Sequence, residues 1–472
     1  MRGWKAVLAG IGGLVVVAVL YAVIVPPELL RVGAGYSAKI ICSAEALQGR
    51  DPDEVLETDV QAPGNPLLRA FWVSTDRQAG RVRAAFAGII APTTAEERVG
   101  LGCATFPDGN LADARDQSAP SAPGPSTSAA LWPTGAQTDL TGQGRFEAVL
   151  RDDALTGPRM RAVVVIKDGK LVAERYGDGF DATTPLLGWS MTKTVTAALV
   201  GTAIEAGKLR MDQSDLLPEW RGDDRAKITV AQLMSMSSGL RFNEDYGDVS
   251  DVTRMLYLEP DMAEFAASQP LEHTPGTHFS YSSGTAVLLS RIWQDAVGDT
   301  STALAWPRRK LFDPLGMSSA TLETDASGTF VGSSYLYATA RDWARFGQFL
   351  LQDGKWDGRQ LLPAEFVQRM HAPAPTDGVY GQGMTWLAGP SDQQKAGDDA
   401  RFGLPADTYW LEGHDGQTVT VIPSADMVVV RMGLTPSDLN YRPQKLVAAL
   451  LDAAKATAHA SSNIPSNSAE DR

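Results

Sequence analysis

The sequence is poor in cysteine, in histidine and in positive charge. Its 472 residues include two cysteines and five histidines, and the histidines form neither an HExxH motif nor another recognisable metal-binding spacing. The formal net charge is −14 at pH 7 without any basic cluster, so the surface would repel phosphates and nucleic-acid binding is not expected. We expect no metal or organic cofactor, and the chemistry must come from side chains alone.

Charge is also missing from the first apolar segment. Residues 6–25 read AVLAGIGGLVVVAVLYAVIV, which is long enough to cross roughly 30 Å of hydrocarbon as a helix. Arg2 and Lys5 precede it, which favours a cytoplasmic N-terminus. We predict a membrane anchor over residues 1–30 and a periplasmic or extracytoplasmic location for the rest. The alternative is a cleaved signal peptide, with small residues at Gly33, Ala34 and Gly35 as the cleavage site.

Export would place the two cysteines in a compartment where a disulfide can form. In an oxidising compartment, a disulfide between Cys42 and Cys103 is favoured over two unpaired buried thiols, because no other cysteine competes. Such a bond would stabilise the fold by about 4 kcal/mol in the chain-entropy model.

Composition divides the remaining chain into four parts. We predict a small N-terminal module over 31–112, a Pro/Ser/Gly-rich linker or surface wrap over 113–144, a main domain over 145–457 and a disordered tail over 458–472. In the main domain, Asp168-Gly169 separates two strand-like runs and predicts a hairpin, and 418–422 with 427–432 predict a second. Helical patterns lie between them at 190–207, 230–235, 251–267, 284–297 and 340–351. This order predicts an α+β fold, with helices flanking an antiparallel sheet and an inserted all-helical region.

The segment Ser190-Met191-Thr192-Lys193 carries the strongest chemical signal. Residues i and i+3 share a helix face, so Lys193 can reach the Ser190 hydroxyl and act as its base, provided that burial or a cation keeps the lysine neutral. Apolar residues at Met191, Val195, Leu199 and Ala203 predict an amphipathic helix after the serine. The alternative is that Ser190 only caps the helix and that Lys193 is solvated.

Two later segments could complete a site. Tyr281-Ser282-Ser283 precedes a helical run, where Tyr281 could relay a proton and Ser283 could hold the lysine or the substrate; a packing tyrosine with a capping serine is the alternative. Gly413-His414-Asp415-Gly416-Gln417 precedes a strand, and the backbone N–H of Gln417 could pair with that of Ser190 as an oxyanion hole. A simple turn is the alternative for this segment.

Taken together, S-x-x-K, Y-x-S and H-x-G in this order resemble the serine β-lactamase and D,D-peptidase superfamily, and its class C-like branch above all. The resemblance covers about 161–433, and the segment FNEDYGDVSDVTRMLY at 242–257 is similar to 6-aminohexanoate-dimer hydrolases. It implies an acylated Ser190, Lys193 as base, Tyr281 as proton shuttle, and His414 with Gly416 lining a strand edge. It also implies that Tyr246 can hydrogen-bond a leaving amine.

The chain departs from the lactamase pattern at two positions. Ser283 stands where β-lactamases usually have asparagine, and His414 replaces the lysine that helps hold the substrate carboxylate. A histidine is mostly neutral at pH 7, so weak β-lactamase activity at most is expected. We therefore predict a serine hydrolase of small linear amides or carboxylic esters.

Other functions stay open at this point. A D,D-peptidase and a penicillin-binding sensor of the cell envelope are the alternatives, although residues 1–5 leave no room for a cytoplasmic signalling domain. An α/β-hydrolase is excluded because Thr192, not glycine, stands two residues after Ser190, so the G-x-S-x-G elbow is missing. The sequence gives neither the natural substrate nor the oligomeric state.

Overall fold

A computed structural model describes residues 2–62, 66–76, 79–111, 117–124, 128–141, 143–391, 395 and 397–461. The chain forms two compact units, each assembled from separate segments. The helical unit contains 1–122, 206–308 and 321–337, and the sheet unit contains 123–205, 309–320 and 338–472. The N-terminal region thus shares a unit with the inserted helices, whereas residues 145–457 are divided between both units.

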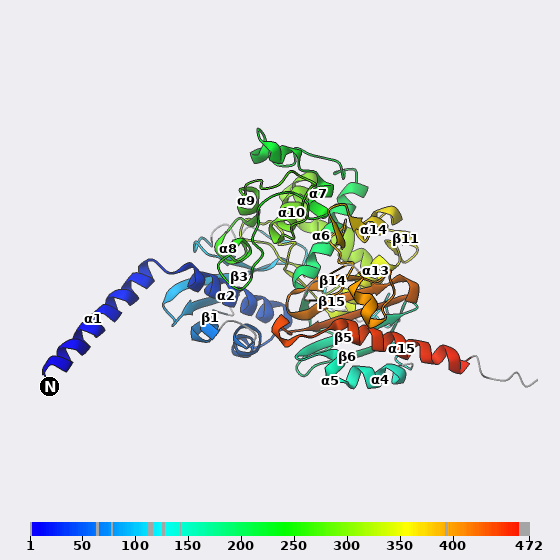
Figure 1. The fold of residues 1–472 in the computed structure, drawn as a ribbon, viewed down its shortest axis with the longest axis horizontal. Coiled ribbons are helices and arrows are strands. Elements are labelled where there is room, and N and C mark those ends of the chain that lie inside the picture. Colours follow the sequence, from blue (N-terminus) through cyan, green and yellow to red (C-terminus); the bar gives the residue numbers. More distant parts are fainter. Residues whose placement is uncertain are drawn as a thin grey trace, which may run out of the picture. The chain divides into compact units, whose positions relative to one another are not determined.

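The sheet unit is built on a five-stranded antiparallel sheet (Figure 1). Its strands, in spatial order, are β14 (Tyr409–Gly413), β15 (Gln417–Ile422), β16 (Met427–Gly433), β5 (Met160–Lys167) and β6 (Lys170–Tyr176). Both predicted hairpins are confirmed. Asp168 and Gly169 both have positive φ, 51° and 71°, as a tight turn between β5 and β6 requires. Pairing of β16 with β5 then joins the two ends of the main domain.

Helices cover both faces of this sheet. On one face lies α13 (Ala340–Leu351), where Gly347 brings the helix against Val419 and Val428. On the other, α4 (Gly144–Arg151) and α15 (Pro443–Ser461) pack through Phe146, Leu150 and Leu450. Strand side chains alternate between the two faces, so apolar residues at successive positions of β16 serve two cores. The sheet flanked by helices is therefore confirmed.

The helical unit contains the predicted inserted helices. They are α7 (Val230–Met234), α8 (Asp251–Leu258), α9 (Met262–Ala267), α10 (Ser283–Val297) and α11 (Thr300–Pro307). The single helix predicted over 251–267 is wrong, because the structure has α8 and α9 with a break between them. Pro260 lies in the break, and proline disfavours helical geometry at the residue before it.

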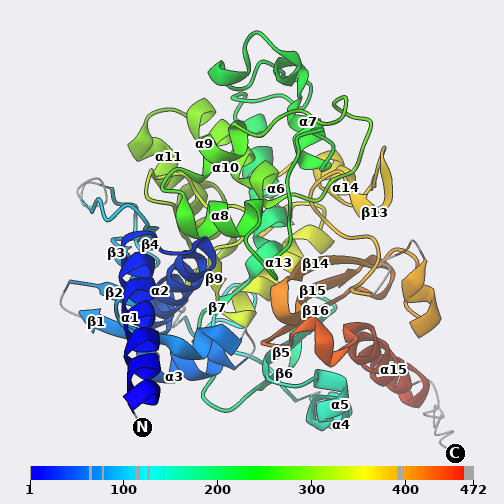
Figure 2. The same ribbon diagram turned by 60° about the vertical axis from the view of Figure 1, so that its left-hand side comes forward.

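The N-terminal region of the helical unit is a helix packed on a small sheet (Figure 2). Helix α2 (Glu28–Gln48) lies on the antiparallel strands β1 (Phe71–Asp76), β2 (Arg81–Phe86), β3 (Ile90–Arg98) and β4 (Gly102–Phe106). Two glycines let α2 pack closely on its neighbours, Gly33 on the sheet and Gly35 on α8. A Cβ on Gly33 would come within 2.6 Å of the Phe71 ring, and one on Gly35 within 2.8 Å of Tyr257 in α8.

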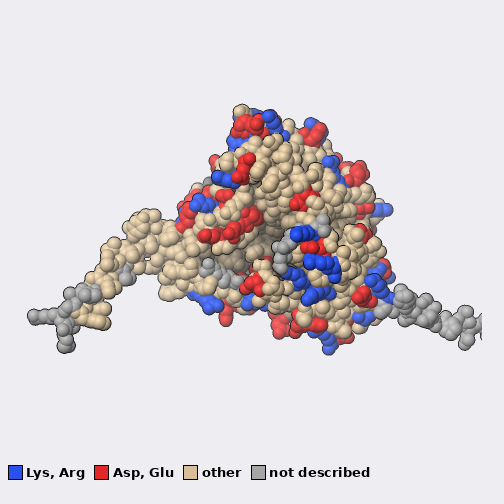
Figure 3. Space-filling view, viewed as in Figure 1, with Lys and Arg blue, Asp and Glu red and all other residues tan. Residues whose placement is uncertain are grey.

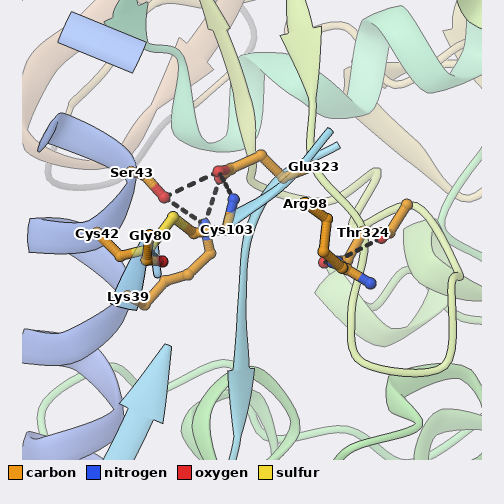
Figure 4. The surroundings of a disulfide bond; sticks show 8 residues. All are labelled: Lys39, Cys42, Ser43, Gly80, Arg98, Cys103, Glu323 and Thr324. Atoms are coloured by element: carbon orange, nitrogen blue, oxygen red, sulfur yellow. Dashed lines mark hydrogen bonds and ion pairs between the residues drawn. A yellow bond between two sulfur atoms is a disulfide. The ribbon is translucent and has the colours of Figure 1, made fainter. Parts of the chain in front are cut away.

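A disulfide and a buried ion pair hold α2 in place (Figure 4). The predicted Cys42–Cys103 bond is confirmed and joins α2 to β4. One turn away, Lys39 pairs with Glu323, which also accepts hydrogen bonds from Ser43 Oγ at 2.8 Å and from the Cys103 backbone N–H at 2.7 Å. Both charged side chains are almost completely buried, and burial lowers the pKa of Lys39 although Glu323 opposes the shift.

The first helix, α1 (Arg2–Ile24), exposes apolar side chains, and no charged residue follows Lys5 within it (Figure 3). Leu14 is 72% exposed and Ile24 77% exposed. Among the described residues, no single helix is apolar over a sufficient length to span a bilayer. One pair, Gly10–Ile24 with Glu28–Gln48, meets that criterion jointly, with a bend of 60°.

The predicted linker and tail carry more structure than their composition indicates. Within 128–141, Arg345 donates to the carbonyls of Pro133 and Gly135, and Trp132 is buried, so this stretch wraps the sheet unit. Helix α15 extends to Ser461, so the first residues of the predicted disordered tail are helical. Residues 112–116 and 462–472 lie outside the described residues.

The following helices and strands complete the fold. They are α3 (Pro52–Val55), α5 (Asp153–Thr156), α6 (Thr192–Glu205), α12 (Asp313–Leu315), α14 (Ala364–Met370), β7 (Leu186–Leu187), β8 (Thr321–Leu322), β9 (Leu336–Ala338), β10 (Lys355–Trp356), β11 (Arg359–Gln360), β12 (Pro373–Ala374) and β13 (Asp377–Gly381).

Candidate active site

Ser190 and Lys193 meet at the start of α6 in the sheet unit. Ser190 lies in a short 3-10 turn, Trp189–Met191, and Lys193 in the first turn of α6. The lysine Nζ is 3.0 Å from the serine Oγ. Lys193 is only 1% exposed, so its amine is withdrawn from water, whereas Ser190 is partly exposed as a residue. A lysine that acts as base requires such a setting.

Tight packing presents the serine. A Cβ on Gly188 would come within 2.1 Å of the Trp343 ring, so a larger residue does not fit before the turn. Trp189 has a φ of 48°, a left-handed conformation that is unusual for a bulky residue. Strained backbone of this kind concentrates at functional sites.

Helix α6 does not have the predicted amphipathic character. Every residue from Thr192 to Ala203 is buried, and Gly201 lies against Phe366 and Leu362 of the same unit. A helix that runs through the interior needs no polar face. The apolar residues have the predicted spacing, but threonines and alanines on the other faces of the helix are buried as well.

The strand edge runs beside the nucleophile turn. A Cβ on Gly413, at the end of β14, would come within 2.2 Å of the Gly188 carbonyl oxygen. His414 follows in a short turn, where its ring is 5.6 Å from the Trp189 ring in an edge-to-face arrangement, and its side chain is 43% exposed. The structure therefore brings His414 to the residue before Ser190.

Gln417 uses its side chain to fix this edge. The amide Nε2 donates to the carbonyls of His414, at 3.1 Å, and of Gly433, while Oε1 accepts from the Gly433 N–H at 2.9 Å. Its role in an oxyanion hole can therefore come only from its backbone N–H and stays a prediction. Gly416 has a φ of 83°, which favours glycine there.

Arg431 supports the same edge and was missed in the sequence. It is fully buried in β16 and donates to the carbonyls of Gly416, at 2.9 Å, and Thr156, at 3.0 Å. Burial lowers the pKa of its guanidinium, and the Tyr441 ring lies 4.5 Å away. An arginine inside the run MVVVRM was the available signal, because a strand buried on both faces rarely carries a charge.

The helical unit carries the tyrosine segment. Ser282 is the N-cap of α10, and its Oγ accepts from the Thr285 N–H at 3.0 Å. Tyr281, just before the cap, is half-buried, and Ser283, the first residue of the helix, is fully buried. The capping serine of the sequence alternative is thus present, and it leaves Tyr281 and Ser283 on either side of the cap.

Glu244 binds Ser283 and was not predicted as a site residue. Its Oε2 accepts from the Ser283 backbone N–H at 2.8 Å, and its Oε1 accepts from the Ser283 Oγ at 2.5 Å. The Tyr246 hydroxyl lies 3.5 Å from both Glu244 Oε1 and Ser283 Oγ. Burial, reinforced by the Glu244 carboxylate, raises the pKa of Tyr246 well above its usual value, so this phenol stays protonated.

The predicted residues thus form two groups. Ser190, Lys193, His414, Gly416 and Gln417 belong to the sheet unit, and Tyr246, Tyr281 and Ser283 to the helical unit. Among the residues that the structure describes, no group of three or more histidines, cysteines or carboxylates is arranged to hold a metal ion.

The family model named Beta-lactamase matches residues 153–453, which is more than half of the chain. The chain belongs to the Beta-lactamase family. It is therefore a serine hydrolase with a β-lactamase-like fold, as the order of its three motifs predicted.

Within the Beta-lactamase family, this member is similar to proteins with different activities. It is 24% identical over 305 residues to 6-aminohexanoate-dimer hydrolase of Paenarthrobacter ureafaciens, a match that covers 58% of this chain and 72% of that protein. It is 30% identical over 276 residues to penicillin-binding protein 4 of Amycolatopsis lactamdurans, covering 53% and 67%. The solved structure of a family VIII carboxylesterase matches with a TM-score of 0.53 at 16% identity, covering 68% of this chain and 99% of that one, which shows the fold alone.

Proposed function

We propose that this family member hydrolyses small linear amides or carboxylic esters through an acyl-enzyme on Ser190. The observation that carries the proposal is the buried Lys193 amine, 3.0 Å from the hydroxyl oxygen of the partly exposed residue Ser190. A neutral lysine at that distance can take the hydroxyl proton as the oxygen attacks a carbonyl. The similarity to a 6-aminohexanoate-dimer hydrolase supports the substrate class.

The remaining steps are proposed from the order of the three motifs. Backbone N–H groups of Ser190 and Gln417 would stabilise the oxyanion that forms on the carbonyl oxygen. Tyr281 would pass the proton to the leaving nitrogen or oxygen, and water would then hydrolyse the acyl-enzyme. Exposed His414 would bind a substrate carboxylate less strongly than a lysine, which disfavours penicillins.

The test compares the full-length protein with Ser190→Ala in detergent. Initial rates are measured on a nitrophenyl ester, a linear 6-aminohexanoate dimer and a chromogenic cephalosporin. We expect turnover of the ester or the linear amide that Ser190→Ala abolishes and that Ser437→Ala, an exposed serine of the same unit, leaves unchanged. Turnover that survives in Ser190→Ala would overturn the proposal.

A second function is kept because of one relative. The similarity to a penicillin-binding protein supports a D,D-peptidase or an acylated sensor. A stable penicilloyl adduct on Ser190, seen as a mass increase without ester or amide turnover, would favour that function over the first.

We also propose that α1 anchors the protein, with both units outside the cytoplasm. Its apolar side chains are exposed, which is unfavourable in water. Cleavage at Gly33–Gly35 would cut α2 where it packs on Phe71 and Tyr257, so the structure gives more support to an anchor than to a cleaved signal. The protein should stay in the membrane fraction after a carbonate wash and leave it when residues 2–25 are deleted; a native protein that carbonate releases would contradict the anchor.

A further inference from the structure

Exposed apolar side chains gather where α1 leads into the rest of the helical unit. Only residues 25–27 separate α1 from α2, and the chain bends by 60° between the two helices (Figure 1). Close to this junction, three large apolar side chains are exposed: Leu29 in the first turn of α2, Trp72 in β1, and Ile89 between β2 and β3. Trp72 is 64% exposed, which is unusual for so large an apolar residue. We call these three residues the Trp72 patch.

Trp72 and Ile89 belong to one tight turn. A Cβ on Gly88 would come within 2.6 Å of the Trp72 ring, so the ring lies on the residue before Ile89. Ala87 and Gly88 have φ values of 47° and 76°, and the Ala87 N–H donates to the Ala70 carbonyl at 2.8 Å, just before β1. The backbone therefore presents the two side chains together.

The packing of α2 places this turn at the end of the small sheet that is nearest to α1. Gly33 of α2 lies against Phe71, which begins β1 and pairs with Phe86 at the end of β2. Leu29 is four residues before Gly33, so it lies on the same face of α2 and one turn closer to α1. Helix α1 also contacts β3, the strand that follows Ile89. All three residues of the Trp72 patch thus lie beside the start of α2.

The opposite end of the same sheet provides a comparison. There the disulfide joins Cys103, near the start of β4, to Cys42 in the later half of α2. The turn between β3 and β4 carries Val99, which is 67% exposed, whereas Ile89 is 58% exposed. The two ends therefore each expose an aliphatic side chain to a similar degree, and they differ in their distance from α1.

A bilayer crossed by α1 would be the surface nearest to the Trp72 patch. Residues 25–27 span at most about 10 Å even when fully extended, so they hold the start of α2 close to the headgroups. Tryptophan is favoured in that region because its ring is apolar and its N–H is polar. Apolar side chains beside it gain by leaving water for the boundary between headgroups and acyl chains.

We propose that the Trp72 patch rests in the headgroup region of the bilayer and so holds the helical unit against the membrane surface. The partner is a phospholipid surface, recognised through apolar contact rather than through a specific headgroup. This inference rests on the proposed anchor, because α1 brings the patch to the bilayer. It adds a second contact, made by the folded unit itself.

A single fluorescent label in the full-length protein tests the docking. Cys42 and Cys103 are bonded to each other, so a new cysteine at Ile89→Cys or Val99→Cys takes the label NBD alone. Each labelled protein is reconstituted into phosphatidylcholine vesicles, with or without a lipid that carries a nitroxide near the top of its acyl chain. With Ile89 about 5–10 Å inside the headgroup boundary, its label should shift to the blue and lose about half of its emission to the nitroxide. The label at Val99→Cys should emit as it does in water.

A charge in the patch provides a second measurement. Trp72→Glu, added to the labelled Ile89→Cys chain, places a carboxylate where the apolar ring was, and desolvating that charge is costly. We expect it to abolish most of the quenching, whereas Val99→Glu in the same labelled chain should leave the quenching unchanged. Thermal unfolding checks that both chains are folded, and the comparison of labels at 89 and 99 decides the question without either charge variant.

The outcomes separate the docking from the anchor. If the labelled protein floats with the vesicles but the labels at 89 and 99 are quenched equally or not at all, the docking is wrong and the anchor stands. A blue shift at 89 without quenching by the nitroxide lipid would place another protein surface, such as a second copy of the chain, on the patch, and would also contradict the docking. Protein that does not float with the vesicles overturns the anchor, and the docking with it.

Discussion

The two groups of site residues are held by different physical means. In the sheet unit, close packing positions the nucleophile, since Gly188 and Gly413 have no room for a Cβ and Trp189 adopts a left-handed backbone. In the helical unit, hydrogen bonds do the corresponding work, through the Ser282 cap and the Glu244 carboxylate. Packing fixes where an atom lies, whereas a hydrogen-bond network also fixes which atom carries the hydrogen.

The largest effect is expected on turnover, when the base is removed from the closely packed site of the sheet unit. Lys193→Met keeps a long unbranched side chain in the buried site and removes the base, so turnover should fall by about a thousandfold while the fold is retained. Rates on the nitrophenyl ester, together with thermal unfolding, check this. Lys170→Met, at an exposed lysine of the same unit, should be neutral; near-native turnover in Lys193→Met would remove the lysine from the mechanism.

The free energy of unfolding of the helical unit should depend on pH through Asp325. Burial raises the pKa of this carboxyl from 3.8 to about 6, although Ser327 and the Met262 N–H favour its charged form. The folded state thus keeps a proton that the unfolded chain releases, so the stabilisation from this group is full below pH 4 and is lost as pH rises to 6. The loss is about 3 kcal/mol in the free energy of unfolding.

Urea unfolding at pH 4 and pH 7 measures that loss. Asp325→Asn should reduce the difference between the two pH values, whereas Asp438→Asn, at an exposed carboxyl of the sheet unit, should not. An Asp325→Asn variant with the native pH dependence would show that another group titrates.

Gly188→Ala tests the packing directly. Gly188 has a φ of −82°, which alanine adopts without strain, so only the overlap with the Trp343 ring opposes the change. We expect a loss of about 1–3 kcal/mol in the free energy of unfolding, with reduced turnover. Trp343→Phe in the same chain should recover part of it. Gly378→Ala, where nothing lies within 4 Å, is the control, and equal losses in both glycine variants would argue against the packing account.

The smallest effect is expected at the cap of α10. Ser282→Ala removes the acceptor for the Thr285 N–H and should lower the free energy of unfolding by about 1 kcal/mol. Ser282→Asp keeps an acceptor and should stay near the native value in the same urea titration. A loss of equal size in both variants would mean that the serine matters for its size and not for the cap.

Local signals predicted the elements that depend on local chemistry. The turn at Asp168-Gly169 needs two positive φ values, and helix α13 was expected and found over the same residues, 340–351. Serine and lysine three residues apart likewise meet within one turn. Contacts between distant segments were not readable: Glu244 reaches Ser283 across 39 residues, and Arg431 reaches Thr156 across 275. The sequence around Glu244 or Arg431 gives no indication of the residue that each one contacts.

The ion pair and the disulfide beside it can form only in a certain order as the chain is synthesised. Lys39 and Glu323 are separated by 284 residues, so the ribosome makes the lysine long before its counter-ion exists. Cys42 and Cys103 are only 61 residues apart and can be oxidised earlier. A nascent chain can therefore be cross-linked at α2 first, and Lys39 would meet its counter-ion only after the segment around Glu323 has been made.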